Sequence, residues 1–249
     1  MPRYFVEVVY KGTAYSGFQV QENANSVQAE IEKAFSTCCR RQVIMTGSSR
    51  TDTGVHALQN FLHFDYPDEM DLGILYNINA VLPADIAVKN IFPVDADAHC
   101  RYDAEWREYR YCIYKFKDPF LHDRGYYYPY PLDIEKLQIA AKLVMLFNDF
   151  SAFSKRSTQV KTFLCTMMES EWMIENNSII YQVKANRFLR GMVKGLVGTM
   201  LQVGRNKISI EEFQAVIENK NTADVDFSVP GQGLFLMRVK YPEGLLANS

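Results

Sequence analysis

The sequence predicts an α+β fold in two halves. Strand-like runs rich in β-branched and aromatic residues alternate with helix-periodic segments in both halves. Apolar residues make up 48% of the 249 positions and aromatic residues 13%, which is enough for a sizeable core. A chain of this length forms one large domain or two modest ones. We divide it into an N-terminal half, residues 1–104, and a C-terminal half, residues 105–249.

In the first half, residues 4–10 (YFVEVVY) have the composition of a strand and lead into a turn marked by glycines. Ser26 has the chemistry of a helix N-cap, and apolar residues at helical spacing behind it predict a helix over 27–38. Further strands are predicted over 42–47, 59–65 and 87–94.

The second half begins with an aromatic strand over 109–116. Two helices are predicted by their start signals: Asp133 caps the first, and Ser209 forms a capping box with Glu212 at the second. The remaining predicted elements are a hairpin around 175–177, a helix over 188–203 and a strand over 233–241.

Charge is unevenly distributed along the chain. The net charge of −2 and the pI near 6.1 argue mildly against a nucleic-acid-binding protein. However, residues 51–88 contain six acids and no Lys or Arg, whereas residues 184–207 contain six bases and no acid. A local field of this kind matters more to a partner than the sum does, so the basic stretch favours an anionic partner.

The cysteines and histidines do not predict a metal site. Five cysteines, an odd number with no C-x-x-C spacing, and four scattered histidines make a zinc site improbable. Reduced thiols in a cytoplasmic protein are the expectation. We expect no signal peptide, because the N-terminus leads straight into a strand-like run. We expect no membrane span, because no stretch of roughly 18 residues is apolar and uncharged.

The stretch GSSRTDTGVHA, residues 47–57, contains a candidate catalytic carboxylate. Arg50 precedes Asp52 by two residues, and a positive neighbour lowers the pKa of a carboxylate and holds it ionised. An ionised carboxylate can act as a nucleophile or a base. The alternative is an Asx-type turn with a surface ion pair worth at most ~1 kcal/mol, and spacing alone leaves both interpretations open.

Two further groups of residues could bind nucleic acid. Arg187, Arg190 and Lys194 share one face of the helix predicted over 188–203, which suits phosphates, although a solvated helix face has the same pattern. Glycines in this helix predict that another segment packs closely on it. Tyr109 lies on the aromatic strand just after two arginines, an arrangement that can stack on single-stranded bases or simply form core.

These stretches resemble the tRNA pseudouridine synthase family named TruA. GSSRTDTGVHA is similar to the family's G-R-T-D-A-G-V-H-A loop, and YKGTAYSGFQVQ (10–21) to its Y-D-G-x-x-Y-x-G-W-Q start. Further similar stretches follow in family order, so that the resemblance covers nearly the whole chain. They are SVQ, NINAVLPADIAV, HCRYDAEWREYRY, NDFSAFS, ANRFLRGMVKGLVGTML and GLFLMRVKY.

The resemblance implies an antiparallel sheet flanked by helices, with a cleft between two related halves. It implies that Asp52 is the catalytic residue, that Arg50 pairs with it and helps to admit a flipped uridine, and that Tyr109 stacks on the target base. It also implies uridine-to-pseudouridine isomerisation in the tRNA anticodon arm, where the family targets lie at positions 38–40. The resemblance further implies that the protein is a homodimer and that it needs neither a cofactor nor a metal.

The RNA-binding residues implied by the resemblance are Arg187, Arg190, Lys194, Lys161 and Arg101. Several positions depart from the family pattern: Ser49 replaces Gly, Phe18 replaces Trp, Cys100 replaces Ala, and Lys161 and Lys194 replace Arg. Lysine lacks the two-pronged guanidinium, so phosphate contacts there should be looser.

Three alternatives to this activity remain open at the level of sequence. They are a catalytically lapsed RNA-binding paralogue, a synthase for a different RNA, and a carboxylate-based hydrolase of a nucleoside or sugar. The hydrolase ranks last, because such enzymes usually pair two carboxylates. Whether Asp52 attacks C1′, attacks C6 or removes a proton is also left open.

Overall fold

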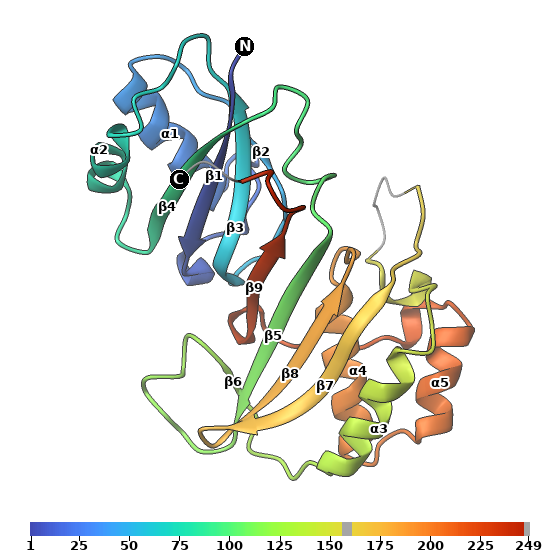
Figure 1. The fold of residues 1–249 in the computed structure, drawn as a ribbon. Helices are drawn as coiled ribbons and strands as arrows, with labels where there is room; N and C mark the ends of the chain where they lie inside the picture. Colours follow the sequence, from blue (N-terminus) through green and yellow to red (C-terminus); the bar gives the residue numbers. More distant parts are fainter. Residues whose placement is uncertain (156–160, 247–249) are drawn as a thin grey trace. The chain divides into compact units, whose positions relative to one another are not determined.

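The computed structural model describes residues 1–155 and 161–246, and the chain divides into two compact units (Figure 1). The first unit contains Met1–Glu105 together with the chain from Leu236 onward, and the second contains Trp106–Phe235. The sequence division assigned all of 105–249 to the second half. The C-terminal segment joins the first unit because the Val239 N–H donates to Gln59 Oε1 at 3.0 Å, and local sequence patterns carry no information about such pairing.

The first unit is built on an antiparallel sheet. Strand β1 (Arg3–Tyr10) lies between β3 (His56–Asp65) and β4 (Ile86–Val94), and the short β2 (Thr46–Gly47) pairs with β3 (Figure 1). The predicted strands over 4–10, 59–65 and 87–94 are therefore confirmed.

The predicted strand over 42–47 is wrong for its first four residues. The Ser36 hydroxyl accepts the Val43 N–H at 2.9 Å, and a Glu32 carboxylate oxygen accepts the Met45 N–H at 2.9 Å. Side chains of the preceding helix thus take backbone donors that a strand would have used, and only β2 remains.

Two helices complete the regular structure of the first unit. Helix α1 (Val27–Cys39) begins where the sequence predicts, because the Ser26 hydroxyl accepts the Ala29 N–H as an N-cap. Helix α2 (Ile74–Val81) contacts both α1 and β4. Its buried Ile78 and the buried Ile31 and Phe35 of α1 contribute to the core of this unit.

The second unit has its own antiparallel strands, in the order β5 (Trp106–Tyr114), β8 (Ser178–Ala185) and β7 (Met167–Glu175) (Figure 1). The hairpin predicted around 175–177 is confirmed, and Asn176 and Asn177 at its turn both have positive φ, as a type I′ turn requires. The short β6 (Tyr126–Tyr127) runs parallel to β5, and β9 (Leu234–Lys240) begins at the end of this unit and belongs to the first unit from Leu236 onward.

Three α-helices belong to the second unit: α3 (Ile134–Val144), α4 (Met192–Gly204) and α5 (Ile210–Glu218). The Asp133 cap and the capping box at the start of α5 are both confirmed. None of the helices within residues 1–155 and 161–246 is long and apolar enough to cross a membrane. Short 3₁₀ helices lie at Gly12–Ala14, Ser151–Phe153, Thr222–Asp224 and Gly231–Gly233.

The prediction that Arg187, Arg190 and Lys194 share one helix face is wrong. Helix α4 begins at Met192, so Arg187 and Arg190 precede it, and only Lys194 is helical. Gly191 has φ of 76°, a left-handed conformation that interrupts the helical periodicity of the sequence. We call residues 187–194 the basic segment.

The close neighbour predicted for α4 is confirmed. A Cβ on Gly198 would lie 2.1 Å from the Asp226 carbonyl oxygen, and one on Gly195 would lie 2.8 Å from Val225 Cγ1. The Thr199 hydroxyl also accepts the Asp226 N–H at 3.2 Å. The glycines of α4 therefore allow the backbone around residue 226 to lie directly on the helix.

Candidate active site

Residues 47–57, here called the Asp52 loop, run from the end of β2 into the start of β3 and are unusually well enclosed for so polar a stretch. Ser49 and Thr51 are buried, and buried polar groups need hydrogen-bond partners. The Thr51 and Tyr10 hydroxyls hydrogen-bond at 2.8 Å, and the Asn60 side-chain amide donates to the Ser49 carbonyl at 3.0 Å. The neighbours of Asp52 in the sequence are thus fixed to β1 and β3.

The segment 11–18 packs against the Asp52 loop. The Phe18 N–H donates to the Thr51 carbonyl at 3.0 Å. Gly12 approaches the Val55 carbonyl oxygen so closely that a Cβ on Gly12 would lie only 2.0 Å from it. The first two stretches that carry the family resemblance therefore form one structural unit, and Gly12 is required for their close approach.

Asp52 itself occupies the turn at the tip of this framework. Its backbone carbonyl accepts the Val55 N–H at 3.2 Å, and Gly54 supplies the positive φ of 77° that the turn needs. The Asp52 side chain is half-buried. Within the described part of the chain, its carboxylate has no hydrogen-bond or ion-pair partner. The backbone is thus fixed, while the carboxylate is left available for a bound group.

Arg50 is exposed and projects from the same loop. Among residues 1–155 and 161–246 it forms no ion pair with Asp52, so the pairing implied by the resemblance stays a prediction. Instead, Arg50 lines a pocket of about 200 Å³ together with Phe18, Arg101 and Tyr102. The structure therefore brings Arg50 and Arg101, two of the predicted site residues, to one pocket that also contains an aromatic ring.

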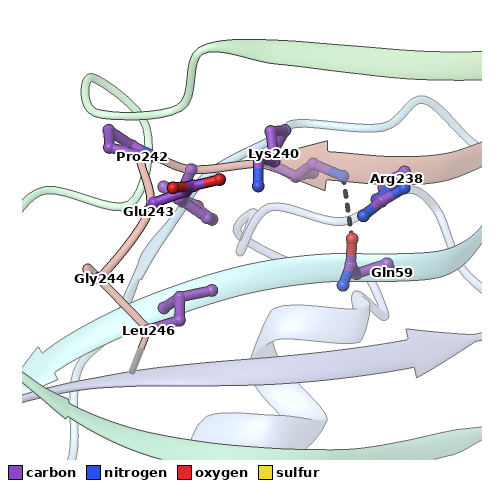
Figure 2. A pocket seen from close by; sticks show the side chains of 9 residues that line it. Gln59, Arg238, Lys240, Pro242, Glu243, Gly244 and Leu246 are labelled. Atoms are coloured by element: carbon purple, nitrogen blue, oxygen red, sulfur yellow. Dashed lines mark hydrogen bonds between the residues drawn. The ribbon is translucent and has the colours of Figure 1, made fainter. Parts of the chain in front are cut away.

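A larger pocket of about 330 Å³ lies along the C-terminal segment of the first unit (Figure 2). It is lined by Gln59, by residues 238–244 and by Leu246. The Gln59 side chain is already engaged with the Val239 backbone. This pocket contains none of the predicted site residues, and we do not assign the reaction to it.

Tyr109 lies in β5 of the second unit and is 8% exposed. Its ring packs edge-on against Phe188, with the centroids 5.1 Å apart, and Phe188 belongs to the basic segment. Tyr111, on the same face of β5, is fully buried and donates to the Pro230 carbonyl at 2.8 Å. Tyr111 of the predicted aromatic strand is therefore a core residue, whereas Tyr109 contacts the basic segment through Phe188.

The predicted RNA-binding residues of the second unit differ in their exposure. Arg190 and Lys161 are exposed, and Arg187 and Lys194 are half-buried. In the described ranges no carboxylate forms an ion pair with Arg187 or Arg190. Their positive charge is therefore not neutralised by a neighbouring acid. It is available to a phosphate backbone, which binds to basic side chains.

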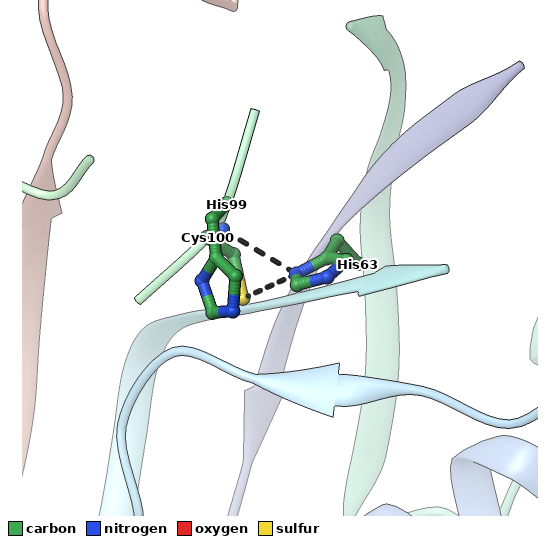
Figure 3. A group of neighbouring side chains, drawn as sticks. All are labelled: His63, His99 and Cys100. Atoms are coloured by element: carbon green, nitrogen blue, oxygen red, sulfur yellow. Dashed lines mark hydrogen bonds between the residues drawn. The ribbon is translucent and has the colours of Figure 1, made fainter. Parts of the chain in front are cut away.

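The fold also gathers residues that the sequence analysis treated as scattered. His63, His99 and Cys100 each present a nitrogen or sulfur atom, and these atoms all lie within 4.8 Å of one another (Figure 3). Burial, followed by the neighbouring charges of His99 and Arg3, lowers the pKa of His63 to about 4. Burial also lowers the pKa of His99. Sequence spacing did not predict this cluster, because His63 lies 36 residues before His99 and only folding brings them together.

Comparison with known proteins identifies one family along nearly the whole chain. A family model described as tRNA pseudouridine synthase matches residues 8–103 and 141–242. A protein named tRNA pseudouridine synthase A from Parabacteroides distasonis is 42% identical, and its namesakes from Bacteroides fragilis and Staphylococcus aureus are 41% and 36% identical. These alignments cover 97–98% of this chain and 92–98% of the relatives. The chain therefore belongs to the tRNA pseudouridine synthase family.

Proposed function

We propose that this protein isomerises uridine to pseudouridine in tRNA, with the anticodon arm as the region it modifies. The observation that carries the proposal is the Asp52 carboxylate, half-buried and unpartnered among the described residues, on a backbone held by the stretch 11–18. The homologues support a tRNA substrate through their names. We infer that Asp52 is the catalytic residue.

The reaction requires one charged group at the sugar and no redox step. The N1–C1′ bond of uridine breaks, the uracil turns, and a C5–C1′ bond forms. The proton on C5 leaves, and N1 ends with a proton, so the product is an isomer of the substrate. An ionised carboxylate can trap or stabilise the electron-poor C1′, or assist the proton transfer, in a site that excludes water.

The target base must leave its stack before Asp52 can reach it, at a cost of a few kcal/mol. We propose that the Tyr109 ring stacks on the extruded base and offsets part of this cost, as aromatic side chains do for single-stranded nucleotides. The exposed guanidinium of Arg50 is suited to contact a phosphate next to the flipped nucleotide.

The remaining basic side chains contribute affinity for the tRNA backbone in this proposal. Arg101 extends the positive charge of the Arg50 pocket, whereas Arg187, Arg190, Lys194 and Lys161 supply charge on the second unit. Contacts of this kind position the RNA without reading its sequence. A homodimer and a cytoplasmic location, where tRNA is modified, complete the proposal.

The test is direct detection of the product. Wild-type protein is incubated with an unmodified tRNA transcript, and pseudouridine is mapped by chemical labelling and sequencing. We expect product in the anticodon arm, and none with Asp52→Ala, whose tRNA binding should be retained. Asp97→Asn, an exposed carboxylate outside the Asp52 loop, is the matched control and should be fully active. Product formed by Asp52→Ala, or no product from the wild type on any tRNA, would refute the proposal.

A further inference from the structure

We propose that His63, His99 and Cys100 form a binding site for a Zn²⁺ ion in the first unit. The proposal goes beyond isomerisation, which needs no metal, and it uses none of the residues assigned to that reaction. It rests on side chains from two separate stretches, β3 and the residues that follow β4, which the fold brings together.

The distances are close to those of a zinc site. Zinc binds histidine nitrogen at about 2.0–2.1 Å and cysteine sulfur at about 2.3 Å, so two ligand atoms of a tetrahedral site lie about 3.4–3.6 Å apart. Here His63 Nδ1 and Cys100 Sγ are 3.1 Å apart, and all three ligand atoms lie within 4.8 Å (Figure 3). To bind one ion, the ligand atoms that lie farthest apart would have to approach each other by at most about 1.4 Å.

The surrounding backbone holds the ligands in this arrangement. The Cys100 N–H donates to His63 Nδ1 at 3.4 Å, so this nitrogen carries a lone pair and not a proton, and a bound ion would replace that long hydrogen bond. The His99 N–H donates to a carboxylate oxygen of Asp103 at 2.7 Å, which fixes the turn that carries His99. Such outer contacts orient ligands before a metal arrives.

The thiol loses its proton when the ion binds, because the thiolate is the ligand form of cysteine. In the metal-free protein the Cys100 S–H donates a hydrogen bond to the Thr46 carbonyl oxygen at 3.1 Å, and the proton is released to solvent when the ion binds. Cys100 is fully buried, so metal must enter on the side of His99. His99 lines the 200 Å³ pocket with Arg50 and Arg101, and this gives both an entry path and an open fourth position for water or an anion.

The ligand set selects the class of metal. Two imidazoles and one thiolate suit zinc or another soft divalent ion, and they do not suit Mg²⁺ or Ca²⁺, which prefer oxygen. Cys100 supplies the sulfur ligand of the set, and Cys100→Ala removes it.

The experiment uses the full-length protein, stripped with a chelator. Zn²⁺ binding is measured by competition with a chromophoric chelator, and Co²⁺ is added separately as a spectroscopic probe. We expect one Zn²⁺ per chain and a sulfur-to-cobalt charge-transfer band. Loss of a ligand should cost more than the roughly 10- to 100-fold that loss of an outer contact costs, so Cys100→Ala should bind zinc more than about 100-fold more weakly and lose the band.

The matched control is Cys165→Ala, which removes another buried thiol and should leave zinc binding and the cobalt band unchanged. If Cys100→Ala does not fold, as judged by circular dichroism, His99→Gln replaces it, because His99 is only half-buried. His99→Gln should weaken zinc binding by a similar factor. Equal zinc affinity in wild type and in the folded ligand variant, or no zinc bound by wild type, would overturn the proposal whether or not the protein makes pseudouridine.

Discussion

The Asp52 loop carries the negative charge that the proposed reaction needs, and the basic segment carries positive charge for binding RNA. The two regions differ in how firmly they hold the charged side chains. The loop has its backbone fixed by buried hydroxyl, amide and glycine contacts and leaves one carboxylate unpartnered within the described residues. The basic segment turns at Gly191 and presents its arginines at different depths. A reacting group needs one geometry, whereas phosphate binding needs only a positive field, so single changes should matter far more in the loop.

The largest effect is expected from Asp52→Asn, which keeps the shape of the side chain and removes its charge. The rate of pseudouridine formation should fall by roughly 10³-fold or more, since loss of one group that stabilises transition-state charge commonly costs that much. The thermal unfolding midpoint should change little, because the described structure gives the carboxylate no partner to lose. A rate within tenfold of wild type would show that the reaction does not depend on the charge of Asp52, and the contrast between the loop and the basic segment would fail.

Gly12→Ala tests whether the loop depends on the segment beneath it. The new Cβ would lie 2.0 Å from the Val55 carbonyl oxygen, so backbone must move, and we expect a loss of about 2–4 kcal/mol in the free energy of unfolding. Gly73→Ala is the control, since its Cβ meets only the side chain of Asp71 and the change should stay within about 0.5 kcal/mol. Denaturant titration of both variants measures this, and equal stabilities would contradict the described packing.

The free energy of unfolding of the first unit, which contains the Asp52 loop, should depend on pH through His63. Burial lowers the pKa of His63 to about 4, so between pH 6.5 and pH 4 the unfolded chain binds more protons than the folded chain. The stability of the metal-free protein should therefore be complete above about pH 6.5 and fall as the pH drops toward 4, by on the order of 2 kcal/mol. His63→Asn should flatten this dependence, and the exposed His122→Gln should not. Denaturant midpoints across this pH range provide the measurement.

The smallest effect is expected in the basic segment. Arg190→Gln should weaken tRNA binding by a few-fold, about 1 kcal/mol, and reduce the slope of log affinity against log salt by about 0.7–0.9. Filter binding at several salt concentrations would show this. An unchanged salt slope would mean that Arg190 does not contact phosphate.

Sequence predicted the parts of this structure that depend on local chemistry. The cap at Ser26, the capping box before α5 and the Asn176–Asn177 turn are each decided by a few adjacent residues, and the structure confirms them. The specific string around Asp52 likewise pointed to the family from sequence alone.

The errors arose where distant residues decide the conformation. The strand predicted over 42–47 was shortened because Glu32 and Ser36 accept its backbone donors. The helix predicted over 188–203 starts late because Gly191 adopts positive φ. The cluster of His63 with His99 and Cys100 depends on sheet pairing, which no spacing rule contains.

The central claim is that Asp52 performs chemistry while the basic segment only binds, and single-turnover kinetics test it most directly. The rate of pseudouridine formation is measured on one tRNA for Asp52→Asn and Arg190→Gln as the protein concentration is raised to saturation. We predict that Arg190→Gln reaches the wild-type rate at a higher protein concentration and that Asp52→Asn stays slow at every concentration. If Asp52→Asn reached the wild-type rate once enough protein was added, Asp52 would be a binding residue and the account would be wrong.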